Sequence, residues 1–264
     1  MKKISYQKTK NFWENEAKNA EICGYDEYKS GMLIKNDFIA RYRKIEEEKI
    51  FKSIVDIKKS DVVLELGCGS GRWSFFLADK CKFVTAVDFS RNMIKLATSI
   101  QNEKGIKNIK FICKEAENYL DSNRYNIIYL SGFLQYLNDD DVIKLLGNLK
   151  KMFNEKTLLI SRDTVSLTGN RIIKNGDYQV IYRTIDEYKA IFSKFNLNLT
   201  KKQESYIAPF LSCKFGLDKI IYFKIVYFFE ALIIKKVSCL KLLFDDVFRK
   251  RKVKHCFFVY GVKY

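Results

Sequence analysis

The sequence is short of the residues that mark linkers, disulfide frameworks and metal centres. It contains one proline and twelve glycines, and no stretch rich in serine, glycine or proline divides its 264 residues. Its seven cysteines form no C-x-x-C pair, so we expect reduced core thiols in place of disulfides or a zinc site. We therefore expect one domain of a cytoplasmic protein, with no bound metal.

Long uninterrupted apolar runs are also absent. Residues 1–8 carry positive charge but no apolar run follows them, so we expect no signal peptide. The most apolar stretch, residues 220–234, contains Lys224 and Glu230 and is shorter than the about 20 residues that a membrane-spanning helix needs. We interpret it as part of a helical insertion, residues 207–250, that forms a lid or a homodimer surface. Peripheral contact with an anionic membrane is the alternative.

Positive charge is what the sequence has in excess, since lysine and arginine outnumber aspartate and glutamate by 17. Such an excess suits nucleic acid, an anionic membrane surface or an acidic small substrate. A general lysine bias explains it equally well, because only residues 249–254 form a dense basic cluster. The net charge is therefore a hint about the partner of this protein and does not identify it.

The chain is organised around a glycine-rich turn between a short apolar strand, residues 62–66, and an apolar helix. Glu65 is the only charged residue of the strand, and Gly67, Gly69 and Gly71 follow at alternate positions. Glycine permits a tight turn close to a ligand, and the N-terminus of the following helix favours negative groups. The turn therefore predicts a binding site for a nucleotide-type cofactor.

The next strand supplies an acid at the edge of the predicted site. Residues 83–87 are mostly apolar and precede Asp88, a position from which a carboxylate accepts hydrogen bonds from two ribose hydroxyls. The dinucleotide fingerprint G-x-G-x-x-G is not met, because Arg72 stands where its third glycine would be. A dinucleotide-binding turn or a purely structural one is therefore disfavoured.

In order and spacing, residues 65–71 and 87–93 resemble the first two motifs of class I S-adenosylmethionine (SAM)-dependent methyltransferases, E/D-x-G-x-G-x-G and V-D-x-S-x-x-M. The resemblance implies SAM as the cofactor and S-adenosylhomocysteine (SAH) as the product. It also implies a three-layer, Rossmann-like α/β fold with seven mostly parallel strands and an antiparallel last strand. We expect one domain over residues 1–264, with a helical cap at 1–58, a cofactor-binding core at 59–206, the insertion at 207–250 and the last strand at 255–264.

The resemblance also assigns the cofactor contacts. Glu65 and the glycine turn would hold the methionine portion, and Asp88 would hold the ribose. Glu115 with Ala116 would meet the adenine, although the family more often has aspartate at this position. The full predicted set is Glu65, Gly67, Cys68, Gly69, Gly71, Arg72, Asp88, Phe89, Met93, Glu115, Ala116, Ser131 and Gly132.

Residues that bind the methyl acceptor, the molecule that receives the methyl group from SAM, are expected beside the ends of the fourth and fifth strands. Many relatives carry a histidine base near Gln135, and a glutamine cannot take a proton at neutral pH. Asp163 lies at the carboxyl edge of the sheet, where ligands bind, and is predicted as a general base or as an acceptor-orienting carboxylate. Three arginines of this region would bind a phosphate or carboxylate. The predicted acceptor-binding residues are Phe133, Gln135, Tyr136, Arg162, Arg171, Tyr182 and Arg183.

The helices before the first strand would close over the site. Trp13, Tyr25, Tyr28, Arg41 and Arg43 are candidate lid residues there, although each one alone fits a core contact or a solvated arginine better.

We predict methyl transfer to an oxygen of a small anionic metabolite, such as a phosphorylated or nucleotide-linked sugar or another precursor of a bacterial surface polysaccharide (capsule or lipopolysaccharide). An RNA methyltransferase and a membrane-associated lipid or quinone methyltransferase remain as alternatives, and a SAM-binding protein without activity is a further one. The region after Leu130 lacks an N-P-P-Y type signature, with which resembling enzymes methylate planar nitrogens. Nucleic acid is therefore a disfavoured partner that stays open.

Overall fold

The computed structural model of the protein describes residues 3–22, 37–169, 171–205 and 253–262. The predicted insertion at 207–250, with its proposed lid, homodimer or membrane surface, lies outside the described residues, as do Tyr25 and Tyr28 and the side chain of Arg41. The division into cap, core and insertion therefore stays a prediction. Among the described residues, no helix is long and apolar enough to cross a membrane.

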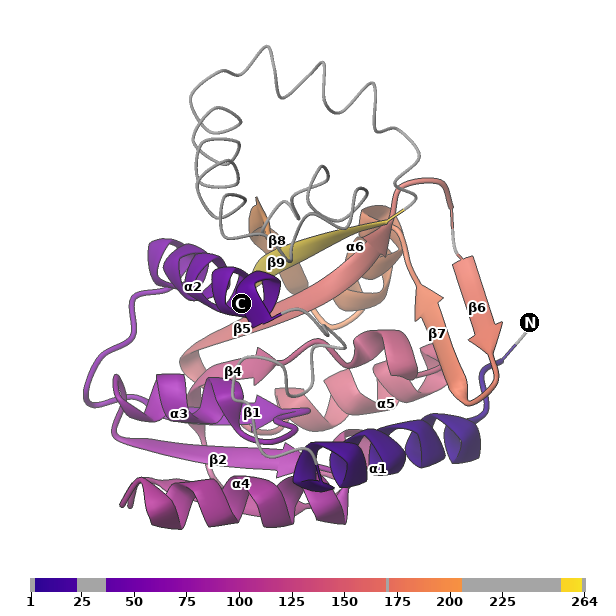
Figure 1. Cartoon of the computed structure of the whole chain (residues 1–264). Helices are drawn as coiled ribbons and strands as arrows, with labels where there is room; N and C mark the ends of the chain where they lie inside the picture. Colours follow the sequence, from indigo (N-terminus) through magenta and orange to yellow (C-terminus); the bar gives the residue numbers. More distant parts are fainter. Residues whose placement is uncertain (1–2, 23–36, 170, 206–252, 263–264) are drawn as a thin grey trace, which may run out of the picture.

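A seven-stranded sheet forms the centre of the molecule (Figure 1). Its strands are β1 (Val62–Leu66), β2 (Phe83–Asp88), β3 (Ile109–Cys113), β4 (Tyr125–Leu130), β5 (Phe153–Ser166), β8 (Leu197–Glu204) and β9 (Val253–Val262). They lie in the order β3-β2-β1-β4-β5-β9-β8, and β1 to β5 are parallel. β9 is antiparallel to both of its neighbours. This confirms the predicted α/β fold and its antiparallel last strand.

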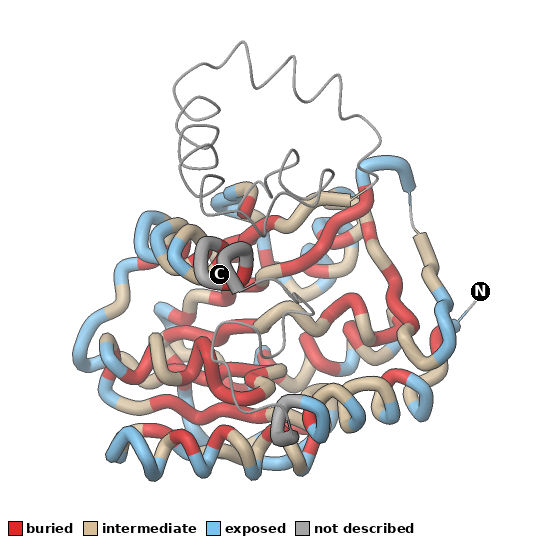
Figure 2. The backbone as a smooth tube through the Cα atoms, viewed as in Figure 1, coloured by how far each residue is buried: buried red, intermediate tan, exposed pale blue. Residues whose placement is uncertain are grey.

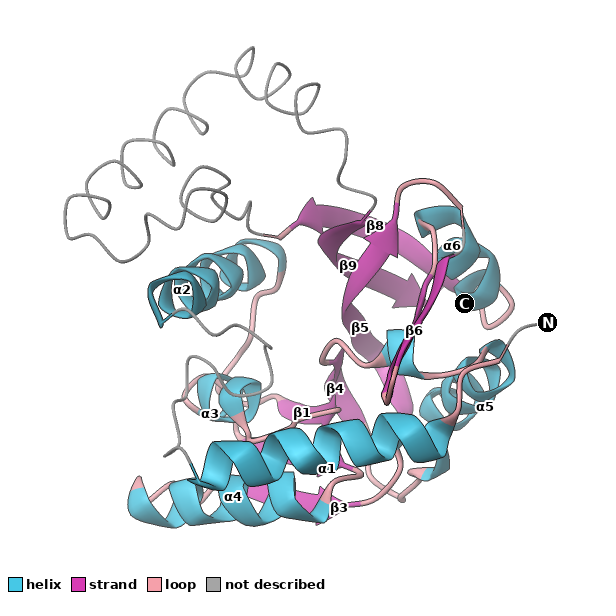
Figure 3. Cartoon of the chain, turned by 45° about the vertical axis from the view of Figure 1, so that its right-hand side comes forward, coloured by secondary structure: helices cyan, strands magenta, loops and turns pink. Residues whose placement is uncertain are grey.

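Helices cover both faces of the sheet (Figure 3). They are α1 (Tyr6–Ile22), α2 (Asp37–Ile54), α3 (Arg72–Ala78), α4 (Arg91–Glu103), α5 (Asp139–Lys150) and α6 (Ile185–Ser193), with the short 3-10 helices η1 (Ala116–Asn118) and η2 (Leu134–Tyr136). α2 and α3 pack on one face, and α5 and α6 pack on the other. α4 packs against β2 and β3, and α1 runs across the edge of the sheet from α4 towards β7 (Tyr178–Tyr182).

Alternation along each strand divides the core into two layers. In β1, Val63 packs with α2 and α3, whereas Leu64 and Leu66 pack with α5 and α6, and none of the three is exposed. Side chains of a strand point alternately to the two faces, so a strand that is buried on both faces is covered by helices on each side. Each fully buried leucine contributes about 1.5–3 kcal/mol to folding. Figure 2 shows this buried layer along the central strands.

The local signals of the sequence also appear in the structure. Arg171–Asn175 (β6) pairs with β7 as an antiparallel hairpin around Gly176 and Asp177, residue types that favour a tight turn. Thr184 and Glu187 form a capping box at the start of α6. The strand order reverses between β1 and β4, and at such a switch point the loops after neighbouring strands diverge and leave a crevice. The turns after β1 and β4 therefore line a ligand site.

Candidate active site

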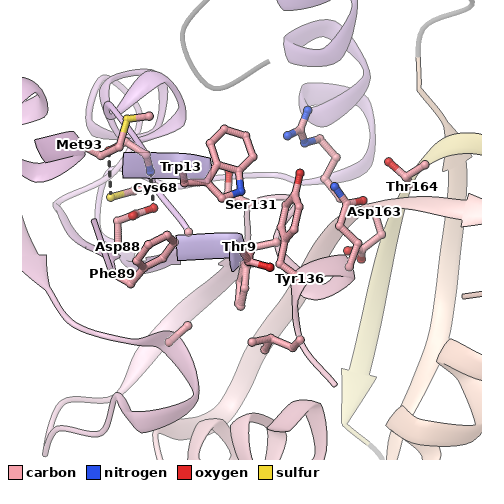
Figure 4. A pocket seen from close by; sticks show the side chains of 18 of the residues that line it. Thr9, Trp13, Cys68, Asp88, Phe89, Met93, Ser131, Tyr136, Asp163 and Thr164 are labelled. Atoms are coloured by element: carbon pink, nitrogen blue, oxygen red, sulfur yellow. Dashed lines mark hydrogen bonds between the residues drawn. The ribbon is translucent and has the colours of Figure 1, made fainter. Parts of the chain in front are cut away.

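A cavity of about 410 Å³ lies at the carboxyl ends of the central strands. Figure 4 shows Cys68 and Asp88 at one end of it, Asp163 and Thr164 at the other, and Tyr136 between them. α1 contributes a wall to the same cavity, since Trp13 also lines it. One cavity therefore joins the predicted cofactor residues to the predicted acceptor residues.

The glycine turn is held by backbone hydrogen bonds between neighbouring strands. The N–H groups of Gly67 and Cys68 both donate to the carbonyl of Val87, at 2.8 and 3.1 Å. Gly67 has φ of 74°, and a Cβ there would lie 2.7 Å from Cδ1 of Phe133. Only glycine fits this conformation and this close approach without displacing the aromatic ring. The turn therefore fixes Phe133 as a wall of the cavity.

Asp88 is positioned by the same turn. Its Oδ2 accepts a hydrogen bond from the N–H of Gly69 and its Oδ1 accepts one from the N–H of Ser90, both at 2.9 Å. Burial raises the pKa of Asp88 to about 6, against the lowering effect of these two donors. A carboxylate offers about four lone-pair sites, so both oxygens can still accept from hydroxyls. The Asp88 carboxylate is therefore suited to accept hydrogen bonds from the ribose hydroxyls of SAM.

Glu65 and Gly71 are cofactor residues of the prediction that do not line the cavity. Glu65 is completely buried and accepts a hydrogen bond from Oγ of Ser74 at 2.5 Å. Burial raises the pKa of Glu65 to about 7, although Ser74 and Ser131 oppose this. The predicted contact of Glu65 and Gly71 with the cofactor therefore stays a prediction, since neither lines the cavity.

The adenine end of the cavity is closed by α1. Lys10 forms an ion pair and hydrogen bond with Glu115, whose other oxygen accepts from Asn118 at 2.5 Å. Asn92 of α4 donates to Glu14 of α1 at 2.6 Å. Glu115 and Ala116 both line the cavity, so they fit the predicted adenine contact, with Glu115 already shared with a lysine. α1 is thus tied to both elements that flank this end.

The middle of the cavity is lined with aromatic rings. Trp13 and Tyr136 meet edge to face with their ring centroids 5.5 Å apart, and Tyr136 lies 6.4 Å from Tyr178 in the same manner. The hydroxyls of Tyr178 and Tyr182 are 2.9 Å apart. All four rings line the cavity. Aromatic side chains therefore form the wall between the two ends of the cavity.

Asp163 reaches the acceptor end from β5. It is 2% exposed, and neither carboxylate oxygen has a hydrogen-bond partner in the part of the chain that the structure describes. Burial raises the pKa of Asp163 to about 6, although Ser161, Arg183 and Arg162 act in the opposite direction. A buried carboxylate with a pKa near neutrality has the property that a general base needs.

The three arginines predicted to bind an anion are not brought together. Arg183 is 1% exposed and binds Asp139 and the carbonyls of Leu134 and Leu137, so it holds the η2 loop. Arg171 does not line the cavity, whereas Arg162 does. This corrects the prediction: Arg183 is structural because its donors are used inside the fold.

A different arginine cluster lies in the cavity wall. Glu47 of α2 is completely buried and accepts from Nε of Arg43 at 2.8 Å, from Nη2 of Arg72 at 2.8 Å and from Nη1 of Arg162 at 2.9 Å. Burial alone would raise the pKa of Glu47, but the three arginines together hold it well below its ordinary value. Oγ of Ser205 lies 3.3 Å from the same carboxylate. We call Arg43, Glu47, Arg72 and Arg162 the arginine cluster.

Sequence reasoning found most of the lining residues through the glycine turn and the strand ends. The predicted residues that line the cavity are Gly67, Cys68, Gly69, Arg72, Asp88, Phe89, Met93, Glu115, Ala116, Ser131, Gly132, Phe133, Gln135, Tyr136, Arg162, Asp163 and Tyr182. Lys10, which lines the cavity, and Glu47, which is buried behind Arg43, Arg72 and Arg162, were not predicted. Glu47 lies four residues after Arg43, and this spacing in the sequence predicts only an ion pair within one helix. His255, the one histidine, also lines the cavity, and its Nδ1 lies 3.0 Å from Oγ1 of Thr164.

Comparison with known proteins agrees with this geometry. Residues 63–156 match the sequence model of a family described as "Methyltransferase domain". The fold is shared with solved SAM-dependent methyltransferases, and with the sequence match this agrees with the predicted resemblance to class I methyltransferases. The glycine turn, the ribose carboxylate and the cavity fit SAM, the cofactor that this family uses.

Individual relatives differ in what they are named for. The chain is 32% identical over 145 residues to "Phosphoethanolamine N-methyltransferase 1" of Triticum aestivum, which is 54% of this chain and 27% of that protein. It is also 32% identical over 96 residues to "Probable cobalt-precorrin-6B C(15)-methyltransferase (decarboxylating)" of Methanocaldococcus jannaschii, covering 36% of this chain and 51% of that one. The chain thus spans about half or less of these relatives' lengths.

A solved structure similar over the full length is 1,6-didemethyltoxoflavin-N1-methyltransferase of Burkholderia thailandensis with bound 1,6-didemethyltoxoflavin and SAH. It has a TM-score of 0.61 at 11% identity, and the match covers 100% of this chain and 93% of that one. At this identity the likeness shows the fold alone.

Proposed function

We propose that the protein transfers the methyl group of SAM to a small anionic acceptor. The observation that carries the proposal is the single cavity that joins a nucleotide-type end, with the glycine turn and Asp88, to an end with Asp163 and the arginine cluster. The acceptor atom that we propose is a hydroxyl oxygen of a phosphorylated or nucleotide-linked sugar, or of another surface-polysaccharide precursor.

Each part of the cavity has a task in this reaction. SAM supplies a methyl group made reactive by its sulfonium. Asp88 and the glycine turn bind the cofactor, and the aromatic wall excludes water and orients the acceptor. Asp163, with its pKa raised to about 6, takes the proton of the attacking hydroxyl. The protein thus acts mainly by positioning the two partners.

A second candidate acceptor is a small amine that carries a phosphate. It is favoured by the relative named for phosphoethanolamine and by the rings of Trp13, Tyr136 and Tyr178, since aromatic faces attract cationic amines. Both candidates share a compact anionic group. They differ in the atom that receives the methyl group, which mass spectrometry of the product identifies.

Calorimetry with SAM and SAH tests the proposal. We expect micromolar binding by the wild type, and loss of binding in Asp88→Ala, because the ribose loses its acceptor. Asp79→Ala is the matched control, since the Asp79 side chain is 77% exposed and lies outside the cavity. Thermal unfolding followed by circular dichroism shows whether each variant is folded. A folded wild type that binds neither SAM nor SAH contradicts the proposal.

An acceptor screen completes the test. We expect turnover with at least one sugar phosphate, nucleotide sugar or phosphate-bearing amine. Turnover only with RNA or with lipid vesicles would favour the alternatives that the net charge leaves open.

A further inference from the structure

We propose that Trp13 and Tyr136 bind the positively charged sulfonium of SAM, so that the cavity holds the methyl donor more tightly than the product SAH. This inference rests on the proposed function, since it takes SAM as the methyl donor. The sequence predicts Trp13 as a lid residue and Tyr136 as an acceptor contact. The inference gives both residues a different task, which is to distinguish the donor from the product.

The two rings lie between the nucleoside end and the acceptor end of the cavity. Asp88 and Glu115 line the first end, and Asp163 lines the second. Figure 4 shows Trp13 and Tyr136 between Asp88 and Asp163. Methyl transfer requires the donor sulfur, the methyl carbon and the acceptor atom to be aligned at short distance. The sulfur that carries the charge therefore belongs in the part of the cavity that these rings line.

The two rings form a corner. Their centroids are 5.5 Å apart and their planes meet at 87°. Two rings in this arrangement bound a corner with one face of each, and the faces of aromatic rings are their electron-rich side. Further rings support the corner, because Phe12 lies 5.3 Å from Trp13 and Tyr178 lies 6.4 Å from Tyr136. The corner is therefore a built feature of the cavity wall.

An aromatic corner of this kind attracts cations. Cations are bound by the faces of tryptophan and tyrosine rings, and the attraction grows when water is removed. Burial raises the pKa of Tyr136 far above its ordinary value, although hydrogen bonds with Gln135 and Tyr178 oppose this. The phenol of Tyr136 is thus neutral at any pH at which the protein works. Its ring therefore acts on a cation through the π-face alone.

Recognition of the sulfonium would separate two ligands that are otherwise almost the same. SAM and SAH share the adenine, the ribose and the amino-acid end, and they differ in one methyl group and one positive charge. Contacts of the glycine turn, Asp88 and Glu115 with these shared parts hold both ligands equally. Specificity is a difference of affinities, so only a group that senses the charge discriminates. Such a group favours the replacement of SAH by SAM after each turnover.

Calorimetry with three ligands tests the inference. SAM, SAH and sinefungin, an analogue with an amine-bearing carbon in place of the methylated sulfur, are titrated into the wild type, Trp13→Leu and Tyr136→Leu. We expect both variants to lose affinity for SAM and for sinefungin by about fivefold or more, and for SAH by less than about twofold. Tyr136→Phe keeps the ring and should retain the preference of the wild type. Phe195→Leu is the control, since it removes a partly buried ring outside the cavity.

Two outcomes would overturn the inference. Equal losses of affinity for all three ligands would show that the rings contact a part that SAM and SAH share. Unchanged affinity for SAM in both leucine variants would leave the rings to the acceptor. Circular dichroism shows whether each variant is folded. Should a leucine variant not fold, Trp13→Phe takes its place, and we expect a smaller loss for SAM with unchanged binding of SAH, because tryptophan binds cations best. A folded wild type that binds neither SAM nor SAH is the separate result that rejects the proposed function.

Discussion

At the scale of single residues, Glu47 shows how a buried carboxylate serves both fold and site. Removing one partner of a buried ion pair costs about 3–5 kcal/mol, because the remaining charges stay uncompensated. We expect Glu47→Gln to lower the free energy of unfolding by this amount in denaturant titrations. Glu48→Gln is the control, since Glu48 is 21% exposed and lies 3.9 Å from Lys44, and its loss should cost less than about 1 kcal/mol. Equal losses would show that Glu47 is not the centre of the cluster.

The raised pKa of Asp163 makes the free energy of unfolding depend on pH. A carboxyl group whose pKa is raised on folding stabilises the protein below its unfolded pKa and loses that contribution as pH rises through the folded value of about 6. The loss amounts to about 3 kcal/mol between about pH 4 and pH 7. Asp163→Asn does not titrate, so its stability relative to the wild type should rise by this amount over that range. A pH-independent difference in urea unfolding would contradict the raised pKa.

At the scale of elements, the turn after β4 gives a contrast between two glycines. Gly132 and Gly176 both have positive φ, 79° and 58°, which costs an alanine about 1 kcal/mol. Only Gly132 lies against Arg162, whereas nothing lies within 4 Å of a Cβ on Gly176. We expect Gly176→Ala to lower stability by about 1 kcal/mol, and Gly132→Ala to lower it further. Identical effects of the two substitutions would show that the close approach of Arg162 to Gly132 does not contribute to the loss of stability.

The elements were more predictable from sequence than the site. The glycine turn, the strands on either side of it, the hairpin around Gly176 and the capping box at Thr184 are local patterns, and the structure contains all of them. The arginine cluster joins Glu47 to Arg162, which are separated by 115 positions. No local pattern encodes such a contact, and the same limit explains why Arg183 was predicted at the site although it holds the η2 loop.

At the scale of the whole molecule, the net charge of +17 predicts that binding of nucleic acid and binding of SAH differ in their dependence on salt. Non-specific binding to nucleic acid releases counterions and weakens steeply as salt rises from about 50 to about 200 mM. SAH carries little net charge and binds in a buried cavity, so its affinity should change little over the same range. Fluorescence titrations with a random single-stranded RNA and with SAH measure both. RNA affinity that does not fall as salt rises would contradict a purely electrostatic origin of RNA binding.

The place of β9 in the sheet has a consequence for synthesis of the chain. Among the strands that the structure describes, β8 pairs with β9 alone, and β9 lies between β5 and β8 although it follows both in the sequence. While the ribosome is still extending the chain, β5 therefore presents an unpaired apolar edge, and β8 has nothing to pair with. The sheet is completed only when residues 253–262 have emerged, so a nascent chain that stalls before them is exposed to aggregation.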